Sequence, residues 1–158
     1  MNKIFLLSGS IHTGKTTRLA EWIKNKEDVD GILQPVIDGK RHIKHISSGK
    51  IQLLEVSPDS NENNIVAIGN YKFNSEVFAW ARSTLLLAYN KHSKWLIIDE
   101  VGKLEMDGKG LEPSISKIIY DLNDKSKVNI VIVVRDYLVP VFLDNYRLNK
   151  NEIQNLEI

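Results

Sequence analysis

Apolar runs of strand length alternate with segments of helical periodicity along the chain. The strongest runs are Ile4–Leu7, Gly31–Ile37, Trp95–Ile98 and Val128–Val134. Largely continuous apolar runs of this length are typical of strands buried on both faces, as in a parallel sheet. Pro35 would remove a hydrogen-bond donor from the second strand, so we expect that strand to lie near a sheet edge or to carry a bulge.

Three segments carry apolar residues at helical spacing and are predicted to be helices: Lys15–Ile23, Asn74–Tyr89 and Pro113–Leu122. The second has the clearest apolar stripe, made by Val77, Phe78, Ala81, Leu85, Ala88 and Tyr89. Asn74 or Ser75 can cap it. Strands that alternate with helices predict an α/β fold with a doubly wound, mostly parallel sheet and helices on both faces. A mixed α+β fold is the alternative.

A more polar region separates the second strand from the second helix. Arg41–Ile46 and Lys50–Val56 alternate loosely between polar and apolar residues around Ser47-Ser48-Gly49, which predicts an inserted β-hairpin. Ile65–Ile68 is another short extended segment. The chain has no internal repeat, low-complexity tract or Pro/Gly/Ser-rich linker, so we expect residues 1–158 to form a single domain.

Composition narrows the function classes. The chain has 158 residues, of which 42% are hydrophobic, and this suits a globular domain rather than a disordered chain. Its 21 Lys and Arg residues nearly balance 20 Asp and Glu residues, so no basic face for nucleic-acid binding is expected. The absence of cysteine excludes a disulfide scaffold, a cysteine nucleophile and a thiolate zinc site.

We expect no membrane association and a cytoplasmic location. The longest apolar stretches, such as Val128–Val134, are far shorter than the roughly 20 residues that a spanning helix needs. The run Ile4–Leu7 is also shorter than the core of a signal peptide, which has about 7–15 residues.

A phosphate-loop motif follows the first strand. It reads Gly9-Ser10-Ile11-His12-Thr13-Gly14-Lys15-Thr16, followed by Thr17 at the start of the predicted helix. In such a loop, successive backbone N–H groups and the helix N-terminus bind phosphates. Lys15 is therefore predicted to reach the β- and γ-phosphate oxygens, and the Thr16 hydroxyl to bind Mg²⁺. His12 stands where many such loops carry glycine, and we interpret it as a solvent-exposed loop residue.

An acidic pair follows the third strong strand. The run Trp95–Ile98 leads into Asp99-Glu100, so Asp99 is expected at the carboxyl end of the sheet beside the phosphate loop. There Asp99 can hold Mg²⁺ through water, and Glu100 is the candidate base that orients or deprotonates the attacking water. Taken alone, Glu100 is better interpreted as a solvated carboxylate at a strand end, but the nearby phosphate loop favours the catalytic role.

Other polar positions give weaker indications of a role in the site. Arg135 follows the last strong strand, so it should emerge at the same sheet edge and offset charge on the γ-phosphate, or else pair with Asp136. Lys103 either reaches the site or faces solvent. Asn149-Lys150-Asn151-Glu152 is similar to the guanine-reading motif of GTPases, but Glu replaces Asp and no strong strand precedes it, so we treat the match as coincidence.

Together these residues resemble the small P-loop nucleoside triphosphatases of the thermophilic-ATPase type, a family that includes the cancer-related nucleoside triphosphatase. The resemblance rests on Gly9–Thr17 and on Ile98-Asp99-Glu100-Val101-Gly102-Lys103-Leu104-Glu105. Gly39-Lys40-Arg41, Gly69-x-Tyr71-x-Phe73 and Val77-Phe78 are similar to one branch of the family. His12 departs from the family's loop, and the chain ends soon after Tyr146-Arg147-Leu148, so its last helix and strand are expected to be short.

The resemblance implies a RecA-like core and Mg²⁺-dependent hydrolysis of several nucleoside triphosphates with loose base selectivity. It assigns Lys15 and Thr16 to phosphate and metal, Asp99 to the metal side and Glu100 to the base.

Two other functions fit a phosphate loop. A small-molecule kinase would need an acceptor pocket and usually an Arg-rich lid, and the hairpin over residues 41–56 is the only acceptor-side element that the sequence offers. A nucleotide-dependent interaction module with slow hydrolysis could use that hairpin and exposed aromatic residues between Tyr71 and Trp80. No particular protein partner is indicated.

Overall fold

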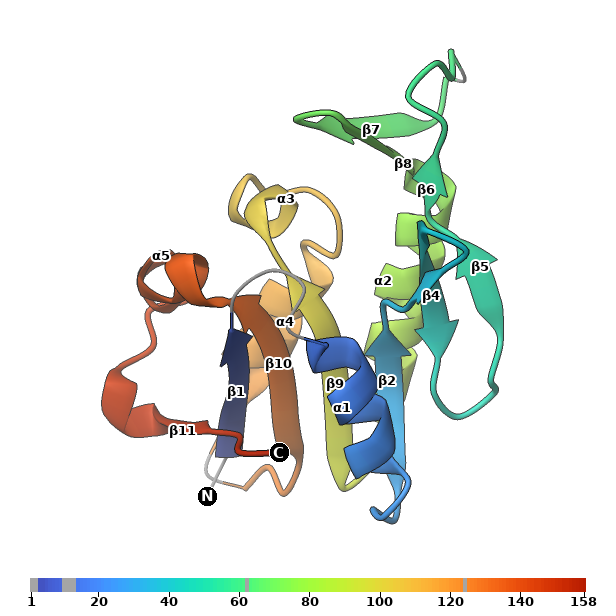
Figure 1. The fold of residues 1–158 in the computed structure, drawn as a ribbon. Helices are drawn as coiled ribbons and strands as arrows, with labels where there is room; N and C mark the ends of the chain where they lie inside the picture. The colour runs from blue at the N-terminus through green and yellow to red at the C-terminus, as the bar shows by residue number, and fades with distance from the viewer. Residues whose placement is uncertain (1–2, 10–13, 62, 124) are drawn as a thin grey trace.

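The centre of the protein is a mostly parallel sheet with the strand order β11-β1-β10-β9-β2-β4-β3, in which β5 also pairs with β4 (Figure 1). The computed structural model describes residues 3–9, 14–61, 63–123 and 125–158. The strands of the main sheet are β1 (Lys3–Gly9), β2 (Val29–Leu33), β3 (Val36–Ile37), β4 (Lys40–His45), β5 (Ile51–Leu53), β9 (Trp95–Val101), β10 (Asn129–Arg135) and β11 (Ile153–Asn155).

The pairing of these strands brings the ends of β1, β9 and β10 together. Strand β10 lies between β1 and β9 and is parallel to both, and β2 is parallel to β9. Strand β4 runs antiparallel to β2. Because the carboxyl ends of parallel strands meet at one sheet edge, the residues that follow β1, β9 and β10 are neighbours. This confirms the predicted α/β class.

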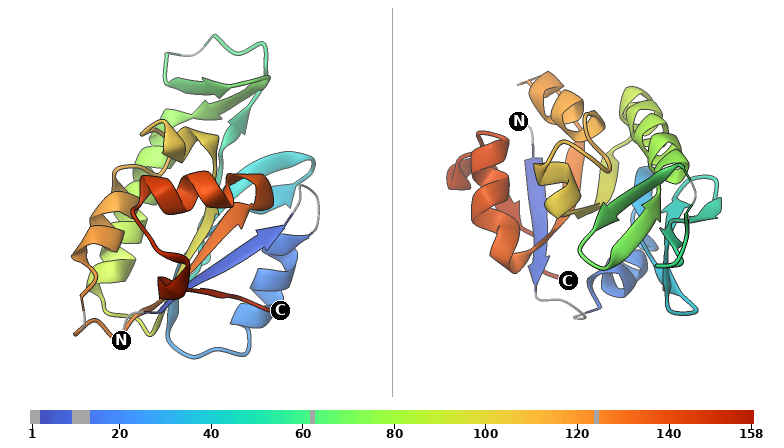
Figure 2. Two further views of the ribbon diagram at one scale, coloured as in Figure 1. Left: turned by 90° about the vertical axis from the view of Figure 1, so that its left-hand side faces the viewer. Right: turned by 90° about the horizontal axis from the view of Figure 1, so that it is seen from above.

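Helices cover both faces of the main sheet (Figure 2). They are α1 (Lys15–Ile23), α2 (Ser75–Asn90), α3 (Lys103–Met106), α4 (Ser114–Asp121) and α5 (Val139–Asn145), with 3₁₀ turns at Asp136–Leu138 and Lys150–Glu152. Successive strand residues point to opposite faces. Accordingly, Ile97 of β9 belongs to the apolar cluster that contains Leu19 of α1, whereas Ile98 belongs to the cluster of α2, α4 and α5.

The predicted amphipathic helix is confirmed with small shifts at its ends. Asn74 caps α2, because its Oδ1 accepts a hydrogen bond of 2.9 Å from the N–H of Glu76. Val77 to Ala88 of the predicted stripe are buried, whereas Tyr89 is partly exposed and its hydroxyl donates to Asp121. The expected C-terminal helix and strand are short: α5 has seven residues and β11 has three.

A small antiparallel sheet stands above the main one and is formed by β6 (Glu55–Val56), β8 (Tyr71–Asn74) and β7 (Ile65–Ile68) (Figure 1). The predicted hairpin exists as β4 and β5, but its predicted second strand divides. The division occurs at buried Leu54, whose N–H donates to the carbonyl of Arg41 and whose carbonyl accepts from the N–H of Asn74. Leu54 thus connects the two sheets.

The prediction for Gly31–Ile37 was wrong in two respects. The segment divides after Leu33, and β2 is an interior strand between β9 and β4. Pro35 lies beyond the end of β2, so its missing N–H costs no ladder bond there. Gly31 has a φ of 125°, and a Cβ at this position would collide with the backbone of Ile97, so the β2–β9 contact requires glycine.

Among the described residues, no helix is long and apolar enough to cross a membrane. Two peptide bonds in the described ranges are cis, Asp99–Glu100 and Glu112–Pro113.

Candidate active site

The phosphate-loop motif joins β1 to α1 as predicted. Strand β1 ends at Gly9, and α1 begins at Lys15 after Gly14, which has a left-handed φ of 72°. The Nζ of Lys15 donates to the Gly9 carbonyl at 3.1 Å, and the lysine is buried. Thr17 is exposed on α1. The predictions for Ser10, Ile11, His12 and Thr13 fall outside the described residues.

Asp99 lies directly beside this loop. Its Oδ2 accepts from the Thr16 hydroxyl at 2.7 Å and from the backbone N–H of Gln34 at 3.1 Å. Burial, together with the nearby charge of Glu100, raises the pKa of the Asp99 carboxyl to about 6, although these two hydrogen bonds lower it. Asp99 therefore lies beside the phosphate loop, where it was expected, and is hydrogen-bonded to Thr16.

The Thr16–Asp99 pair has the chemistry of a magnesium site. Among the described residues, Asp99 Oδ1 is the buried side-chain oxygen without a hydrogen-bond partner, and such a group needs a ligand to offset its desolvation. Mg²⁺ prefers oxygen donors and uses few protein ligands when phosphates supply others. A hydroxyl and a carboxylate oxygen at this position fit the ion, and its charge would keep Asp99 ionised.

Asp99 and Glu100 lie in a β-bulge of β9, and their side chains differ in burial. Ile98 pairs with Ile132 and Val101 with Val134, so two residues of β9 lie opposite one residue of β10. Asp99 is buried, whereas Glu100 keeps part of its side chain accessible. Strand β9 also continues to Val101 instead of ending at Ile98 as predicted.

Two arginines hold the Glu100 carboxylate. Its Oε1 accepts from Nη1 of Arg41 at 3.0 Å and from Nη2 of Arg135 at 3.5 Å. Arg135 is the register partner of Gly9, so it lies at the edge where the phosphate loop starts. Its ion-pair partner is Glu100, while Asp136 instead accepts from the N–H of Tyr137.

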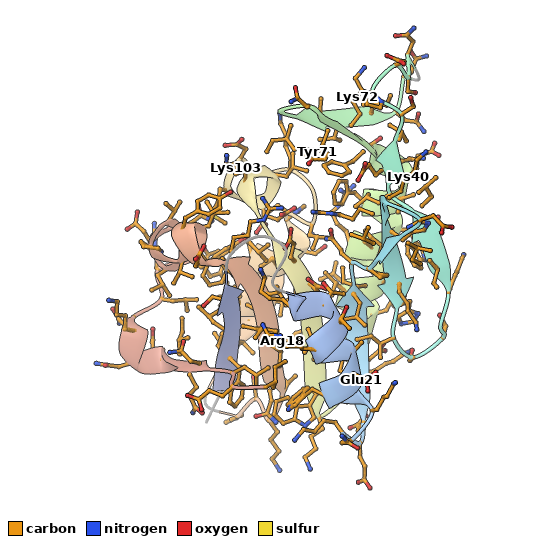
Figure 3. The ribbon with its side chains drawn as sticks, viewed as in Figure 1. Arg18, Glu21, Lys40, Tyr71, Lys72 and Lys103 are labelled. Carbon is orange, nitrogen blue, oxygen red and sulfur yellow. The ribbon has the colours of Figure 1, made fainter. Side chains whose placement is uncertain are left out.

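A cavity of about 360 Å³ opens beside Glu100. Its lining comes from the small sheet, from α3 with its preceding residue, and from the two arginines. Lys103 of α3 belongs to this lining and its side chain is exposed, with Nζ 5.7 Å from the centre of the Tyr137 ring. Figure 3 shows Lys103 and Tyr71 on α3 and on the small sheet, respectively.

Glu105 shapes the loop around α3. Its carboxylate accepts from the N–H of Gly102 at 2.7 Å and from that of Leu111 at 3.0 Å. Burial raises the pKa of Glu105 to about 7, which these hydrogen bonds oppose. The glutamate that ends the octapeptide motif is therefore a structural group that fixes the backbone next to the cavity.

Two further residues contact the acidic pair without having been predicted from the sequence, Arg41 and Gln34. Arg41 was seen only as the start of the hairpin, although Gly39-Lys40-Arg41 belonged to the family resemblance. Gln34 contributes through its backbone N–H, which its side-chain identity does not reveal. Asn149–Glu152 forms a local helix cap in which the Asn149 N–H donates to Glu152 at 2.8 Å.

The chain is similar to known proteins in both sequence and fold. A family model described as NTPase (NTPase_1) matches residues 4–158. The chain belongs to this NTPase family. A search of the curated proteins found no match.

A solved structure has the same fold. The crystal structure of THEP1 from the hyperthermophile Aquifex aeolicus is similar with a TM-score of 0.74 and 23% sequence identity, over 98% of this chain and 88% of that chain. The predicted membership among the small P-loop NTPases and the predicted fold are both confirmed.

Proposed function

We propose that the protein is an Mg²⁺-dependent hydrolase of the β–γ phosphoanhydride bond of nucleoside triphosphates, with loose base selectivity. The observation that carries this proposal is the 2.7 Å hydrogen bond from Thr16 to Asp99, which joins the start of the phosphate-loop helix to the acidic strand. NTPase family membership supports nucleotide chemistry in general.

Each residue at this edge has a chemical role in the proposal. Lys15 binds the β- and γ-phosphate oxygens, and Thr16 and Asp99 hold Mg²⁺, which would neutralise phosphate charge as a Lewis acid when bound. Glu100 orients a water molecule in line with the γ-phosphorus and accepts its proton. The water oxygen bonds to phosphorus, the β–γ P–O bond breaks, and the nucleoside diphosphate and inorganic phosphate leave.

The arginines complete this arrangement. Arg41 and Arg135 restrict the Glu100 side chain through their ion pairs. Arg135, beside Gly9, also stabilises the negative charge that develops on the γ-phosphoryl group.

A phosphate-release assay across ATP, GTP, CTP and UTP, with and without Mg²⁺, tests the proposal. We expect release from all four nucleotides, dependent on Mg²⁺ and with no added acceptor. Lys15→Ala removes the ammonium group at the phosphates and should lower the rate at least about 100-fold.

The same assay separates the other candidate functions. Phosphate transfer that requires an added acceptor would indicate a small-molecule kinase. Very slow release that a cell extract accelerates would indicate a nucleotide-dependent interaction module.

A further inference from the structure

The cavity beside Glu100 extends away from the phosphate loop. Its lining includes Glu100, Arg41 and Arg135, which belong to the proposed site, but none of the loop residues that the structure describes. Its other lining residues, which include Tyr71, Phe73, Phe78, Lys103 and Glu105, come from segments that bind no phosphate in the proposal. A triphosphate on the loop would therefore leave the part of the cavity that these segments line available to another molecule.

One part of the lining is apolar and aromatic. Tyr71 and Phe73 stack with ring centroids 6.3 Å apart and ring planes 8° apart, and Phe73 is buried against Phe78. Tyr71 nevertheless stays 59% exposed, although the neighbouring aromatic residues are covered. An exposed ring at the edge of a cavity is suited to stacking with a planar ligand.

The other part of the lining is positively charged. Arg41 and Arg135 form ion pairs with the partly accessible carboxylate of Glu100, and Lys103 also lines the cavity. Glu105 adds little negative charge because its carboxyl is buried and bonded to two backbone N–H groups. Three cations against one accessible carboxylate favour an anionic ligand.

We propose that this cavity is a second ligand site, adjacent to the triphosphate site, for a planar aromatic or heteroaromatic ring that carries an anionic group. A volume of about 360 Å³ is at the small end of ligand pockets and suits a molecule up to the size of a nucleoside monophosphate. The ring stacks on Tyr71, and the anionic group lies near Lys103 and Arg41. The inference rests on the proposed function only for the position of the triphosphate.

Calorimetric titration tests this site on the full chain. The phosphate loop is first saturated with Mg²⁺ and a non-cleavable ATP analogue, and the probes are AMP, GMP, CMP, UMP and phenyl phosphate. We expect at least one ring-bearing probe to bind with a micromolar to submillimolar Kd, and inorganic phosphate to bind at least 10-fold more weakly. Binding by the nucleotides alone assigns the ligand to nucleotides, whereas equal binding of phenyl phosphate assigns it to aryl anions in general.

Substitutions of residues that line the cavity test whether the probe binds there. Tyr71→Ala and Lys103→Ala should each weaken binding at least 10-fold, and Tyr71→Phe should restore it. Tyr120→Ala and Lys117→Ala are matched controls, because both side chains are exposed on α4 and lie outside the cavity lining. Hydrolysis without the probe should be unchanged in the Tyr71 and Lys103 variants.

A second titration uses Lys15→Ala, in which the phosphate loop is impaired. Retained binding there supports a site away from the loop. The proposal is overturned if no ring-bearing probe binds, if filling the loop abolishes binding, or if the Tyr71 and Lys103 variants bind like wild type. Failure of the proposed hydrolysis would instead appear as absent phosphate release, with these binding results unaffected.

Discussion

The two regions that meet at Glu100 differ in how they are built. The edge of the main sheet consists of consecutive parallel strands, and its functional groups Lys15, Thr16 and Asp99 are buried or partly buried and closely bonded. The inserted region, from β3 to β8, is antiparallel and contributes Arg41 and the exposed Tyr71. Glu100 is bound from both sides, by Arg135 of the main sheet and by Arg41 of the insertion.

Because of this difference, we expect the two regions to contribute differently to function. In the proposed function, the parallel edge positions the groups that bind phosphate and metal, which any triphosphate requires. The insertion supplies one of the two cations on the proposed base and most of the apolar wall beside it. Changes in the main sheet should therefore affect folding and catalysis together, whereas changes in the insertion should affect turnover more selectively.

The largest effect on stability is expected from Gly31→Ala in the main sheet. The added Cβ meets the backbone of Ile97, so β2 must separate from β9, at a cost of about 3 kcal/mol or more in the free energy of unfolding. Gly49→Ala is the matched control in the hairpin turn, since Gly49 also has a positive φ, of 73°, but open space around it. Urea denaturation followed by tryptophan fluorescence measures both, and equal losses would disprove the close-approach argument.

A smaller, selective effect is expected from Arg41→Ala. Removing the 3.0 Å ion pair lets the Glu100 side chain leave its position, so kcat should fall about 10- to 100-fold with little change in KM. Arg41→Lys should recover part of the loss. Arg147→Ala, at an exposed position near the C-terminus, serves as the control. Steady-state kinetics that show an unchanged kcat would remove Arg41 from the site.

A pH-dependent effect on stability is expected at Glu105, next to the cavity. Burial raises its pKa from 4.5 to about 7, so between these pH values the folded protein binds a proton that the unfolded chain has released. Its contribution to stability should therefore fall as pH rises through this range, by at most about 1.4 kcal/mol per pH unit. Urea denaturation at pH 5, 6 and 7 in EDTA should show a flatter pH dependence for Glu105→Gln than for wild type. Parallel curves would contradict this assignment.

The difference between the two regions also explains which parts of the site could be predicted from the sequence. Phosphate-loop spacing and an apolar strand before Asp99-Glu100 place Lys15, Thr16 and Asp99 because parallel strands impose a common edge. No such rule places the hairpin, whose Arg41 contacts Glu100 across a separation of 59 residues. The division of Lys50–Val56 between two sheets depends on Leu54 reaching both, which its local pattern does not encode.

The β-bulge in β9 is another feature that the local sequence pattern could not predict, here within the main sheet. The alternation of β9 predicts that Asp99 and Glu100 point differently, and they do. The extra residue opposite β10 follows from the pairing with Val134, which is known only once the sheet has formed. Local patterns thus placed Lys15, Thr16 and Asp99 at one sheet edge, while long-range pairing determined which cations contact Glu100.

The most direct test of the account is single-turnover phosphate release by Glu100→Gln. The amide keeps the size of the side chain and an oxygen that can accept from Arg41, but it cannot take a proton from water. We expect Mg²⁺-dependent triphosphate binding within about 3-fold of wild type and a hydrolysis rate lower by about 100-fold or more. A Glu100→Gln variant that hydrolyses at the wild-type rate would contradict the role of Glu100 as the base.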